Sequence, residues 1–566
     1  MSAENERPQE IQSGHPTRVA FLTGGDTPST RLSIESVCQI AGVEPVAVLI
    51  DTYTPPSNQR WKNLRRNIRR EGISYLWRRG LRFVRDWLDA KAHRIVSEDD
   101  VKNLLRRAFP ERSYSLEELG KRYGFAVIEA GNLNSPEAAE LLRKTGAQLG
   151  VVLGTRILKR STFSVPPRGS INLHKGKVPD YRGMPPGFWE LYEQSPSAGV
   201  TVHFVDDGLD TGDIIGTGEI EIQPFETVNS LRTKLDHLGA AVLADSVRRL
   251  QQGTAEPKKQ PPSTRKAFTK PTRAQERELA MRAAHLREEE SDAKRIFKAG
   301  LYLFFYHSGI YRLRRSRSGG KAGRGAILLH HRVNDISDDS LTTNTRVFAE
   351  QLLLLSRFYK VTATRSIVDH VLLGSRIEPG SVAIHFDDCY RDVYTEASRI
   401  LKAMECPATM FIATGFIDTD RVFEHDRAKY PHRFENLRRE DIPALMERGF
   451  EIGAHTVNHV DLGVIDRQAA QQEITESRKA LEEITGVPIP MFSFPFGKGT
   501  NIREEVRELV REAGCSVLFS AYGGSVTGRS PRFDIPRVGT SSRYRALDLM
   551  MELEGLSVSQ LLSRFR

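Results

Sequence analysis

The sequence predicts an α/β protein built from two α/β domains. Short apolar runs alternate with helical patterns from residue 17 to about 250, and the alternation resumes over 326–566. This rhythm is typical of mostly parallel sheets covered by helices. Between the two parts, residues 251–325 begin with a stretch rich in Gln, Lys, Pro and Thr, which is typical of a linker. The 566 residues suffice for two or more domains, and residues 1–16 are expected to form a disordered tail.

The N-terminal domain opens with an apolar strand at 18–22, which runs into Gly24-Gly25 and a helix at about 30–41. A strand, a glycine-rich turn and a helix in this order begin a Rossmann-like unit, whose helix N-terminus can receive an anionic group. The glycine spacing is not GxGxxG, so the signal for a dinucleotide is weak. Further strands are expected at 46–50, 125–128, 150–153 and 200–205, and a helix at 135–145.

A helical insertion is expected at about 57–120. Between residues 76 and 88, apolar and aromatic side chains recur at helical spacing among four arginines, which predicts a basic amphipathic helix. Such a helix can lie on a membrane or dock a partner. We favour the alternative that the apolar stripe packs on its own domain, because Trp and Leu stripes are usually core.

Three polar residues of the N-terminal domain suit acyl transfer to an amine. Asn172 and His174 alternate along an extended segment and therefore face the same side, and Asp210 lies in a glycine-flanked turn. The Asn172 amide NH₂ can hold an oxyanion while the imidazole polarises the carbonyl. The carboxylate can set the charge of the imidazole and take a proton.

These segments resemble the folate-dependent formyltransferase family over about residues 17–250. The resemblance rests on Asn172-x-His174, Pro179-x-Tyr-Arg-Gly, Gly199-Val-Thr-Val-His and Asp206-x-Gly-Leu-Asp-Thr-Gly-Asp-Ile-Ile. It implies that Asn172, His174 and Asp210 carry catalysis and that 10-formyltetrahydrofolate is the formyl donor. His174 is followed by Lys175-Gly176, where the nucleotide and tRNA enzymes usually have Pro and a small residue, so the acceptor stays open.

The linker is expected to hold a charged helix over about 273–300, followed by the apolar and aromatic run 301–311 and an arginine cluster at 312–317. An apolar stripe beside arginines is typical of a helix at a membrane surface. A helix that docks one domain on the other is an equal alternative. No β-barrel domain, which tRNA formyltransferases carry at this position, is visible in the pattern.

The C-terminal domain is organised around the strand 382–386. Its side chains alternate between two faces, which predicts a half-buried strand that ends in the carboxylates Asp387 and Asp388. Adjacent buried charges are usually held by a divalent metal. His455 and His459, four residues apart, can face one point, and one Asp with two His leaves coordination positions open for water. The strand and helix rhythm predicts a complete or distorted (β/α) barrel with functional residues at strand ends.

This half resembles the polysaccharide deacetylase (NodB-like) family over about residues 325–545, through Phe-Asp-Asp at 386–388, His-Thr-x-x-His at 455–459 and Phe-Pro-Phe-Gly at 494–497. The resemblance implies that Asp387 is the general base. It also implies that Asp388, His455 and His459 hold the metal, with zinc favoured, and that Pro495 and Phe496 line the substrate site.

The chain departs from this family at three points. Cys389 replaces the usual Gly, Ser493-Phe494 stands where an Arg often precedes the Pro-aromatic motif, and no His follows His459. Some permuted members place the acidic His early, and His331 in His330-His331-Arg-Val matches that position. His331 is therefore our expected general acid, against the alternative of a structural strand-end residue. Arg537 is expected to orient a carboxylate.

The composition narrows the setting. The four cysteines are scattered without a CxxC pair, which suits reduced thiols in the cytoplasm. The polar N-terminus does not resemble a signal peptide, and no apolar run approaches the ~20 residues that span a bilayer. The net charge of +10 fits nucleic acid, anionic lipid, phosphorylated substrates or simply a solvated basic surface. Peripheral contact with the inner face of the cell membrane through the basic helices is therefore an open expectation.

Together the two halves predict a bifunctional enzyme acting on a small-molecule or lipid-linked amino sugar, in cell-surface polysaccharide or lipid-sugar synthesis. One half removes an N-acyl group and the other formylates the amine; nucleic acid is not favoured as a partner. The alternative is a single-activity formyltransferase, for a sugar or methionyl-tRNA, with an inactive deacetylase-like binding module. The sequence does not set the oligomeric state.

Overall fold

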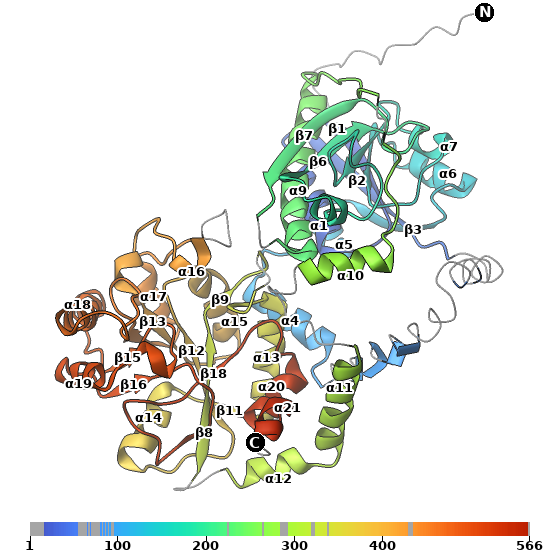
Figure 1. Cartoon of the computed structure of the whole chain (residues 1–566). Coiled ribbons are helices and arrows are strands. Elements are labelled where there is room, and N and C mark those ends of the chain that lie inside the picture. The colour runs from blue at the N-terminus through green and yellow to red at the C-terminus, as the bar shows by residue number, and fades with distance from the viewer. Residues whose placement is uncertain are drawn as a thin grey trace, which may run out of the picture. The chain divides into compact units, whose positions relative to one another are not determined.

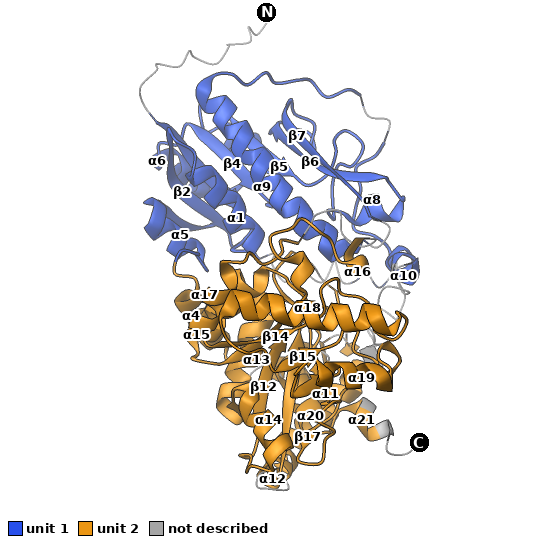
Figure 2. Ribbon diagram, turned by 90° about the vertical axis from the view of Figure 1, so that its left-hand side faces the viewer, with its two compact units in different colours: residues 1–72, 111–289 blue, residues 73–110, 290–566 orange. Residues whose placement is uncertain are grey.

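The computed structural model describes residues 16–54, 95–223, 226–262, 265–282, 292–318, 323–336, 339–427 and 434–563, with isolated residues and short runs between 65 and 91. The expected disordered tail and most of the basic stretch 57–94 therefore lie outside the described residues. The chain forms two compact units, shown in Figures 1 and 2. Unit 1 holds residues 1–72 and 111–289, and unit 2 holds residues 73–110 and 290–566.

Unit 1 is a seven-stranded sheet with the order β3-β2-β1-β4-β5-β6-β7. The strands β3 to β5 pair in parallel, whereas β6 and β7 are antiparallel. The predicted Rossmann-like unit with a mostly parallel sheet is confirmed. The strands are β1 (Thr17–Thr23), β2 (Val43–Asp51), β3 (Ala126–Gly131), β4 (Leu149–Leu153), β5 (Ser170–His174), β6 (Ser197–Phe204) and β7 (Ile214–Glu221).

Helices cover both faces of this sheet, because alternate strand residues are apolar on each side (Figure 1). Val19 and Phe21 of β1 belong to one core with α1 and α9, and Ala20 and Leu22 to a second core with α6 and α7. The helices of unit 1 are α1 (Pro28–Cys38), α5 (Leu116–Tyr123), α6 (Pro136–Lys144), α7 (Arg160–Phe163), α8 (Phe188–Tyr192), α9 (Val228–Gln252) and α10 (Arg273–Arg282).

Unit 2 is built on a nine-stranded sheet that contains the path β16-β15-β14-β13-β12-β8-β17. The neighbours from β8 to β16 pair in parallel, as in the predicted barrel. The larger strands are β8 (Arg324–His330), β12 (Ser381–Phe386), β13 (Ala408–Ile412), β14 (Phe450–Ala454), β15 (Met491–Ser493) and β16 (Val517–Phe519). The two-residue strands are β9 (Arg332–Val333), β10 (Thr342–Thr343), β11 (Lys360–Val361), β17 (Val526–Thr527) and β18 (Val538–Gly539).

The sheet of unit 2 is closed into a ring by residues 535–539. Ile535 bridges Phe519 at the end of β16, and Val538 of β18 pairs with Leu328 of β8. This single extended segment therefore connects the two ends of the parallel sheet. Because Arg537 lies within it, the closing segment carries this side chain to the centre of the barrel, where it is fully buried. The predicted distorted (β/α) barrel is confirmed.

Helices surround the barrel (Figure 1). They are α4 (Glu98–Ala108), α11 (Asp292–His307), α12 (Ile310–Ser316), α13 (Thr345–Phe358), α14 (Thr364–Leu373), η1 (Val393–Ala397), α15 (Ser398–Ala403), η2 (Thr414–Phe416), α16 (Glu424–Arg427), α17 (Asp441–Glu447), α18 (Arg467–Thr485), η3 (Gly499–Asn501), α19 (Glu504–Glu512), α20 (Ala546–Leu553) and α21 (Val558–Ser563).

One helix of unit 2 comes from the N-terminal half of the chain. Residues 57–120 are expected in the N-terminal domain, but α4 packs on α13 and α15 of unit 2. Leu104 is fully buried there, Arg399 donates to the Ala108 carbonyl over 3.0 Å, and Arg357 donates to the Ile95 carbonyl over 3.1 Å. An amphipathic pattern shows that a helix has an apolar face, but not which surface covers that face.

The expected linker helices are present as α10, α11 and α12. Tyr302 of α11 is buried, and its hydroxyl accepts a hydrogen bond from the Val558 amide. Phe297 and Phe304, on another face of this helix, are exposed. Between α9 and β8, the described residues contain no named strand. In the described part of the chain, every helix is too short or too polar to cross a membrane.

Candidate active sites

In unit 1 the structure brings together the three residues predicted for formyl transfer. Asn172 and His174 lie on β5, and Asp210 lies in the loop between β6 and β7 with φ of 54°. Asn172 Nδ2 donates to Asp210 Oδ1 over 3.3 Å, and His174 Nδ1 lies 3.5 Å from Asp210 Oδ2. A left-handed backbone, which Asp tolerates better than most residues, turns the Asp210 carboxylate toward both partners.

His174 is held on both sides of its ring. Its Nε2 donates to the Tyr181 carbonyl over 2.7 Å, so Nδ1 faces the carboxylate of Asp210. Burial lowers the pKa of His174, against the charge of Asp210. Burial also opposes the ionisation of Asp210, but His203 and His174 outweigh it and its pKa falls below the usual value. Both shifts favour the state in which His174 is neutral and Asp210 is ionised.

Sequence reasoning missed His203 as a member of this site. It lies on β6 opposite Asn172, with Nε2 3.3 Å from Asn172 Nδ2 and 3.6 Å from Asp210 Oδ1. Because His203 Nδ1 donates to the Phe204 carbonyl, its Nε2 accepts from Asn172 when the ring is neutral. Both hydrogens of the Asn172 NH₂ are thus engaged, and the expected donation to an oxyanion requires one of these two bonds to be exchanged. The signal was available, because His203 ends the Gly-Val-Thr-Val-His motif.

These residues open into a cavity of about 610 Å³ at the ends of β1, β4 and β5. Its wall includes the glycine-rich turn and the first turn of α1, where an anionic group was expected. Lys175 also lines the cavity and contacts Ser29 of α1 over 2.6 Å and Asp236 of α9. Other lining residues are Thr23, Gly24, Gly25, Thr27, Arg156, Met184 and Phe268. A cavity of this size accommodates a ligand as large as many cofactors.

In unit 2 the predicted catalytic residues also converge, at the carboxyl ends of the barrel strands. Asp387 and Asp388 follow β12, His331 follows β8, and His455 follows β14. His455 and His459 do not lie on a helix. The chain turns after β14 through two residues with left-handed backbone, Thr456 with φ of 64° and His459 with φ of 55°. This turn brings the ring centroids of His455 and His459 to 5.2 Å from each other.

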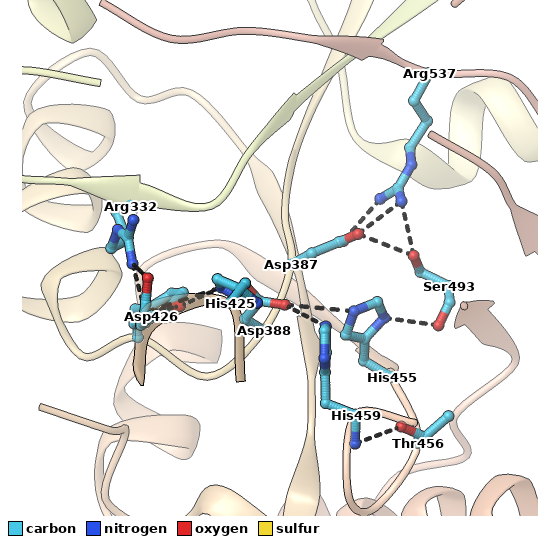
Figure 3. Close-up of polar contacts among 11 residues, drawn as sticks. Arg332, Asp387, Asp388, His425, Asp426, His455, Thr456, His459, Ser493 and Arg537 are labelled. Atoms are coloured by element: carbon cyan, nitrogen blue, oxygen red, sulfur yellow. Dashed lines mark hydrogen bonds and ion pairs between the residues drawn. The ribbon is translucent and has the colours of Figure 1, made fainter. Parts of the chain in front are cut away.

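Asp387 is fixed by Arg537 and Ser493 (Figure 3). Arg537 donates from Nη1 to Oδ1 and from Nη2 to Oδ2, each over 2.7 Å, and Ser493 donates to Oδ2 over 3.0 Å. Burial opposes ionisation of Asp387, but the Arg537 guanidinium outweighs it and the pKa falls to about 2. Asp387 is therefore an oriented carboxylate that stays ionised at neutral pH.

Asp388, His455 and His459 form the one group of metal-type ligands found in the described part of the chain. Asp388 Oδ1 lies 3.1 Å from His459 Nε2 and 3.5 Å from His455 Nε2. His455 Nδ1 donates to the Ser493 carbonyl over 2.7 Å, so in the neutral ring Nε2 turns a lone pair toward a carboxylate. Asp388 Oδ2 is buried and accepts no hydrogen bond from the described residues. Converging lone pairs and an unpaired buried oxygen fit a divalent cation, for which zinc has suitable ligands.

The remaining predicted residues lie around this group. His331 is half-buried, and burial lowers its pKa although the charges of Asp388 and Asp387 act in the opposite direction. Pro495 is buried, whereas the Phe496 ring is 44% exposed and lies 5.1 Å from the His459 ring. Cys389, the unusual residue after the carboxylates, is fully buried, and burial raises its thiol pKa, so it acts as a packing residue.

Sequence reasoning missed a buried polar chain beside Asp388. Arg332 donates to both oxygens of Asp426 over 2.8 and 2.6 Å, and Tyr390 donates to Asp426 Oδ2 over 2.6 Å. His425 lies 2.8 Å from the Tyr390 hydroxyl and 3.9 Å from Asp388 Oδ2. Tyr390 is next but one to Asp388 in the sequence, but no motif connects it with α16.

Two family models match the chain. The formyl transferase model matches residues 90–247 and the polysaccharide deacetylase model matches residues 375–518. The methionyl-tRNA formyltransferase of Ruminiclostridium cellulolyticum is 34% identical over 146 residues, which are 26% of this chain and 45% of that protein. The enzyme of the same name from Syntrophus aciditrophicus is 37% identical over 130 residues, 23% of this chain and 42% of that protein. The chain thus spans less than half the length of these relatives.

Solved structures resemble each half. The Streptococcus pyogenes deacetylase PplD in complex with acetate is 19% identical with a TM-score of 0.36, and the match covers 41% of this chain and 98% of that one. The glycinamide ribonucleotide transformylase 1 from Symbiobacterium toebii is 17% identical with a TM-score of 0.29, and the match covers 44% of this chain and 94% of that one. By its two family matches, the chain combines a formyl transferase region with a polysaccharide deacetylase region.

Proposed function

We propose that the chain is a bifunctional enzyme. Unit 2 removes an N-acyl group from an amino-sugar derivative in a metal-dependent reaction, and unit 1 formylates an amine with 10-formyltetrahydrofolate. The observation that carries this proposal is that one chain holds two separate residue sets suited to the same bond, an amide on an amine. Hydrolysis in unit 2 would supply the amine that unit 1 needs.

For hydrolysis, Asp387 is the proposed general base. Its Oδ1 accepts only from Arg537 among the described residues, so a lone pair remains for the proton of an attacking water. His331 is the proposed acid for the leaving amine, and Pro495 and Phe496 would contact the substrate. Asp388, His455 and His459 would hold a divalent metal, which when bound supplies Lewis acidity to water and to the carbonyl oxygen.

For formyl transfer, the acceptor amine would attack the formyl carbon in the cavity of unit 1. Asn172 is the proposed oxyanion donor, and His174 polarises the carbonyl. Asp210 sets the charge of His174 and takes the proton lost by the amine. This proton is passed to the tetrahydrofolate nitrogen as its bond to the formyl carbon breaks, so that tetrahydrofolate leaves. The contacts of Asp210 with Asn172 and His174 support these roles, because one carboxylate orients both partners.

The proposed cellular location rests on two observations. All four cysteines are free, which suits a reducing compartment such as the cytoplasm. Phe297 and Phe304 of α11 are exposed, which suits peripheral contact with the inner face of a membrane carrying a lipid-linked sugar. A role in cell-surface polysaccharide or lipid-sugar synthesis follows from these proposals.

The experiment is incubation of the purified chain with UDP-N-acetylglucosamine, zinc and 10-formyltetrahydrofolate, followed by mass spectrometry. Release of acetate and formation of an N-formyl sugar are the expected results. Metal content distinguishes the inactive-module alternative. If the purified protein binds no metal and Asp388→Ala leaves every activity unchanged, unit 2 is a binding module.

A second candidate is methionyl-tRNA formylation, because the relatives reported above carry that name. Only part of each relative is matched, and the described linker holds helices and no named strand where the resemblance to tRNA formyltransferases would imply a β-barrel domain. A methionyl-tRNA formylation assay decides between acceptors. Formylation of the tRNA but of no amino sugar would replace the sugar proposal.

A further inference from the structure

The polar chain Arg332–Asp426–Tyr390–His425 is part of neither set of proposed catalytic residues. It lies in the interior of unit 2, where Arg332, Asp426 and Tyr390 are all at most 2% exposed. Burying a guanidinium, a carboxylate and a phenol costs free energy unless each finds a partner. In this polar chain each group has a hydrogen-bond partner. The polar chain ends at the His425 ring, beside the metal-type ligands (Figure 3).

The hydrogen positions along this polar chain follow from the donors and acceptors at each of its contacts. Asp426 accepts from Arg332 at both oxygens and accepts the Tyr390 proton at Oδ2 over 2.6 Å. Since a phenol has one proton, the Tyr390 oxygen can only accept from His425 Nε2, which lies 2.8 Å away. His425 therefore carries a proton on Nε2, and in the neutral ring Nδ1 holds a lone pair.

The His425 ring is fixed but open. It stacks on Phe423, with ring centroids 5.5 Å apart. It meets the His459 ring in an edge-to-face arrangement, with ring centroids 5.7 Å apart. Its side chain is nevertheless 19% exposed, and Nδ1 has no partner within the described part of the chain. The His425 ring is thus held with its Nε2 3.9 Å from Asp388 Oδ2, and among the described residues its Nδ1 remains a free acceptor on a partly exposed side chain. This arrangement suits contact with a ligand beside Asp388 rather than support of the fold.

We propose that His425 is a substrate-binding residue of unit 2, which accepts a hydrogen bond at Nδ1 from a sugar hydroxyl near the amide. This inference rests on the proposed hydrolysis of an N-acyl amino sugar. Tyr390, Asp426 and Arg332 are positioning residues that fix the tautomer and the angle of the ring. His425 therefore helps the site to prefer sugars over acyl compounds that lack hydroxyl groups.

The test compares two probes with the zinc-loaded full chain. One probe is the tetramer of N-acetylglucosamine, and the other is 4-methylumbelliferyl acetate, an activated ester without sugar hydroxyls. For His425→Ala, kcat/KM should fall roughly five- to tenfold on the tetramer, as expected for one lost hydrogen bond, with less than about a twofold change on the ester. His425→Asn, which keeps a donor and an acceptor, should recover part of the loss.

His307→Ala, at an exposed histidine of α11, is the matched control and should leave both rates unchanged. Zinc content should be the same in all variants. An equal fall on both probes would overturn the inference, because His425 would then serve the metal group or the fold; no change on the tetramer would overturn it too. A wild-type chain that hydrolyses only the ester contradicts the sugar assignment, and one that hydrolyses neither probe refutes the proposed hydrolysis itself.

Discussion

Arg537 and Asp387 lie 150 positions apart in the sequence, yet they form a bidentate ion pair with two contacts of 2.7 Å and are both buried. The segment that closes the barrel ring carries the guanidinium to the carboxylate. Leaving a buried carboxylate without its partner costs more than exchanging both groups. We therefore expect Arg537→Gln to destabilise unit 2 by about 3–5 kcal/mol, as measured by denaturant unfolding.

The double variant Arg537→Gln with Asp387→Asn serves as the control for this pair. It removes the buried charge along with its partner and should recover a substantial part of the lost free energy of unfolding. Equal losses in the single and double variants would contradict the account. The double variant should lack amide hydrolysis, because it removes Asp387, the proposed base.

The same pair predicts how stability depends on pH. The pKa of Asp387 is about 2 in the folded state, below the value of ~3.9 for an unfolded chain. The unfolded state thus binds the proton first as the pH falls, so the stability that Asp387 contributes is present above pH ~4 and is lost down to about pH 2. Calorimetry of metal-free protein should show a steeper acid loss, on the order of 2 kcal/mol, for the wild type than for Asp387→Asn. Parallel curves would refute the depressed pKa.

Metal binding should depend on the three converging ligands of unit 2. Asp388→Ala or His455→Ala should reduce zinc affinity by at least about 100-fold, because each substitution removes a side chain that would bind the metal directly. Elemental analysis and competition with a chelator measure this change. Glu378→Ala, at an exposed ion pair with Lys360, is the control and should retain zinc. Formyl transfer by unit 1 should survive in every variant, and its loss would show that the two sites are not separate.

Formyl transfer should fail when Asp210 loses its charge. Asp210→Asn keeps the shape and tolerates the left-handed backbone at φ of 54°, but it can no longer receive a proton or hold a charged His174. We expect kcat to fall about 10²- to 10⁴-fold in a formylation assay with a preformed amino sugar. Asp207→Asn, at an exposed partner of Arg160, should behave as the wild type. A near-normal kcat for the Asp210→Asn variant would show that Asp210 has no role in the proposed mechanism.

Helix α4 should support unit 2 although it lies in the N-terminal half of the chain. Leu104 is fully buried against that unit, so Leu104→Ala should cost about 2–5 kcal/mol of its unfolding free energy. Arg107→Ala on the exposed face is the control, with an expected change below about 0.5 kcal/mol. Calorimetry that shows the loss in unit 1 instead would contradict the assignment of α4.

Local patterns predicted much of both folds and the core of both residue sets. The strand ends at Asp387 and His455 were visible because alternation and short motifs are properties of neighbouring residues. The partners of these residues were harder to find. Ser493 reaches the site from the end of β15, and His425 reaches it from α16. The sequence of α4 gives no sign of the surface that this helix covers. Such contacts depend on the closed barrel, which no single segment encodes.

The most direct test of the bifunctional account is mass spectrometry of products from an N-acetylated sugar nucleotide with zinc and 10-formyltetrahydrofolate. The wild type should convert N-acetyl to N-formyl sugar, a product lighter by one CH₂ group. Asn172→Ala should accumulate the free amine, and Asp387→Asn should leave the N-acetyl sugar unchanged while still formylating added amine. Absence of N-formyl product across a panel of sugar acceptors, or its formation by Asp387→Asn from the N-acetyl sugar, would contradict the account.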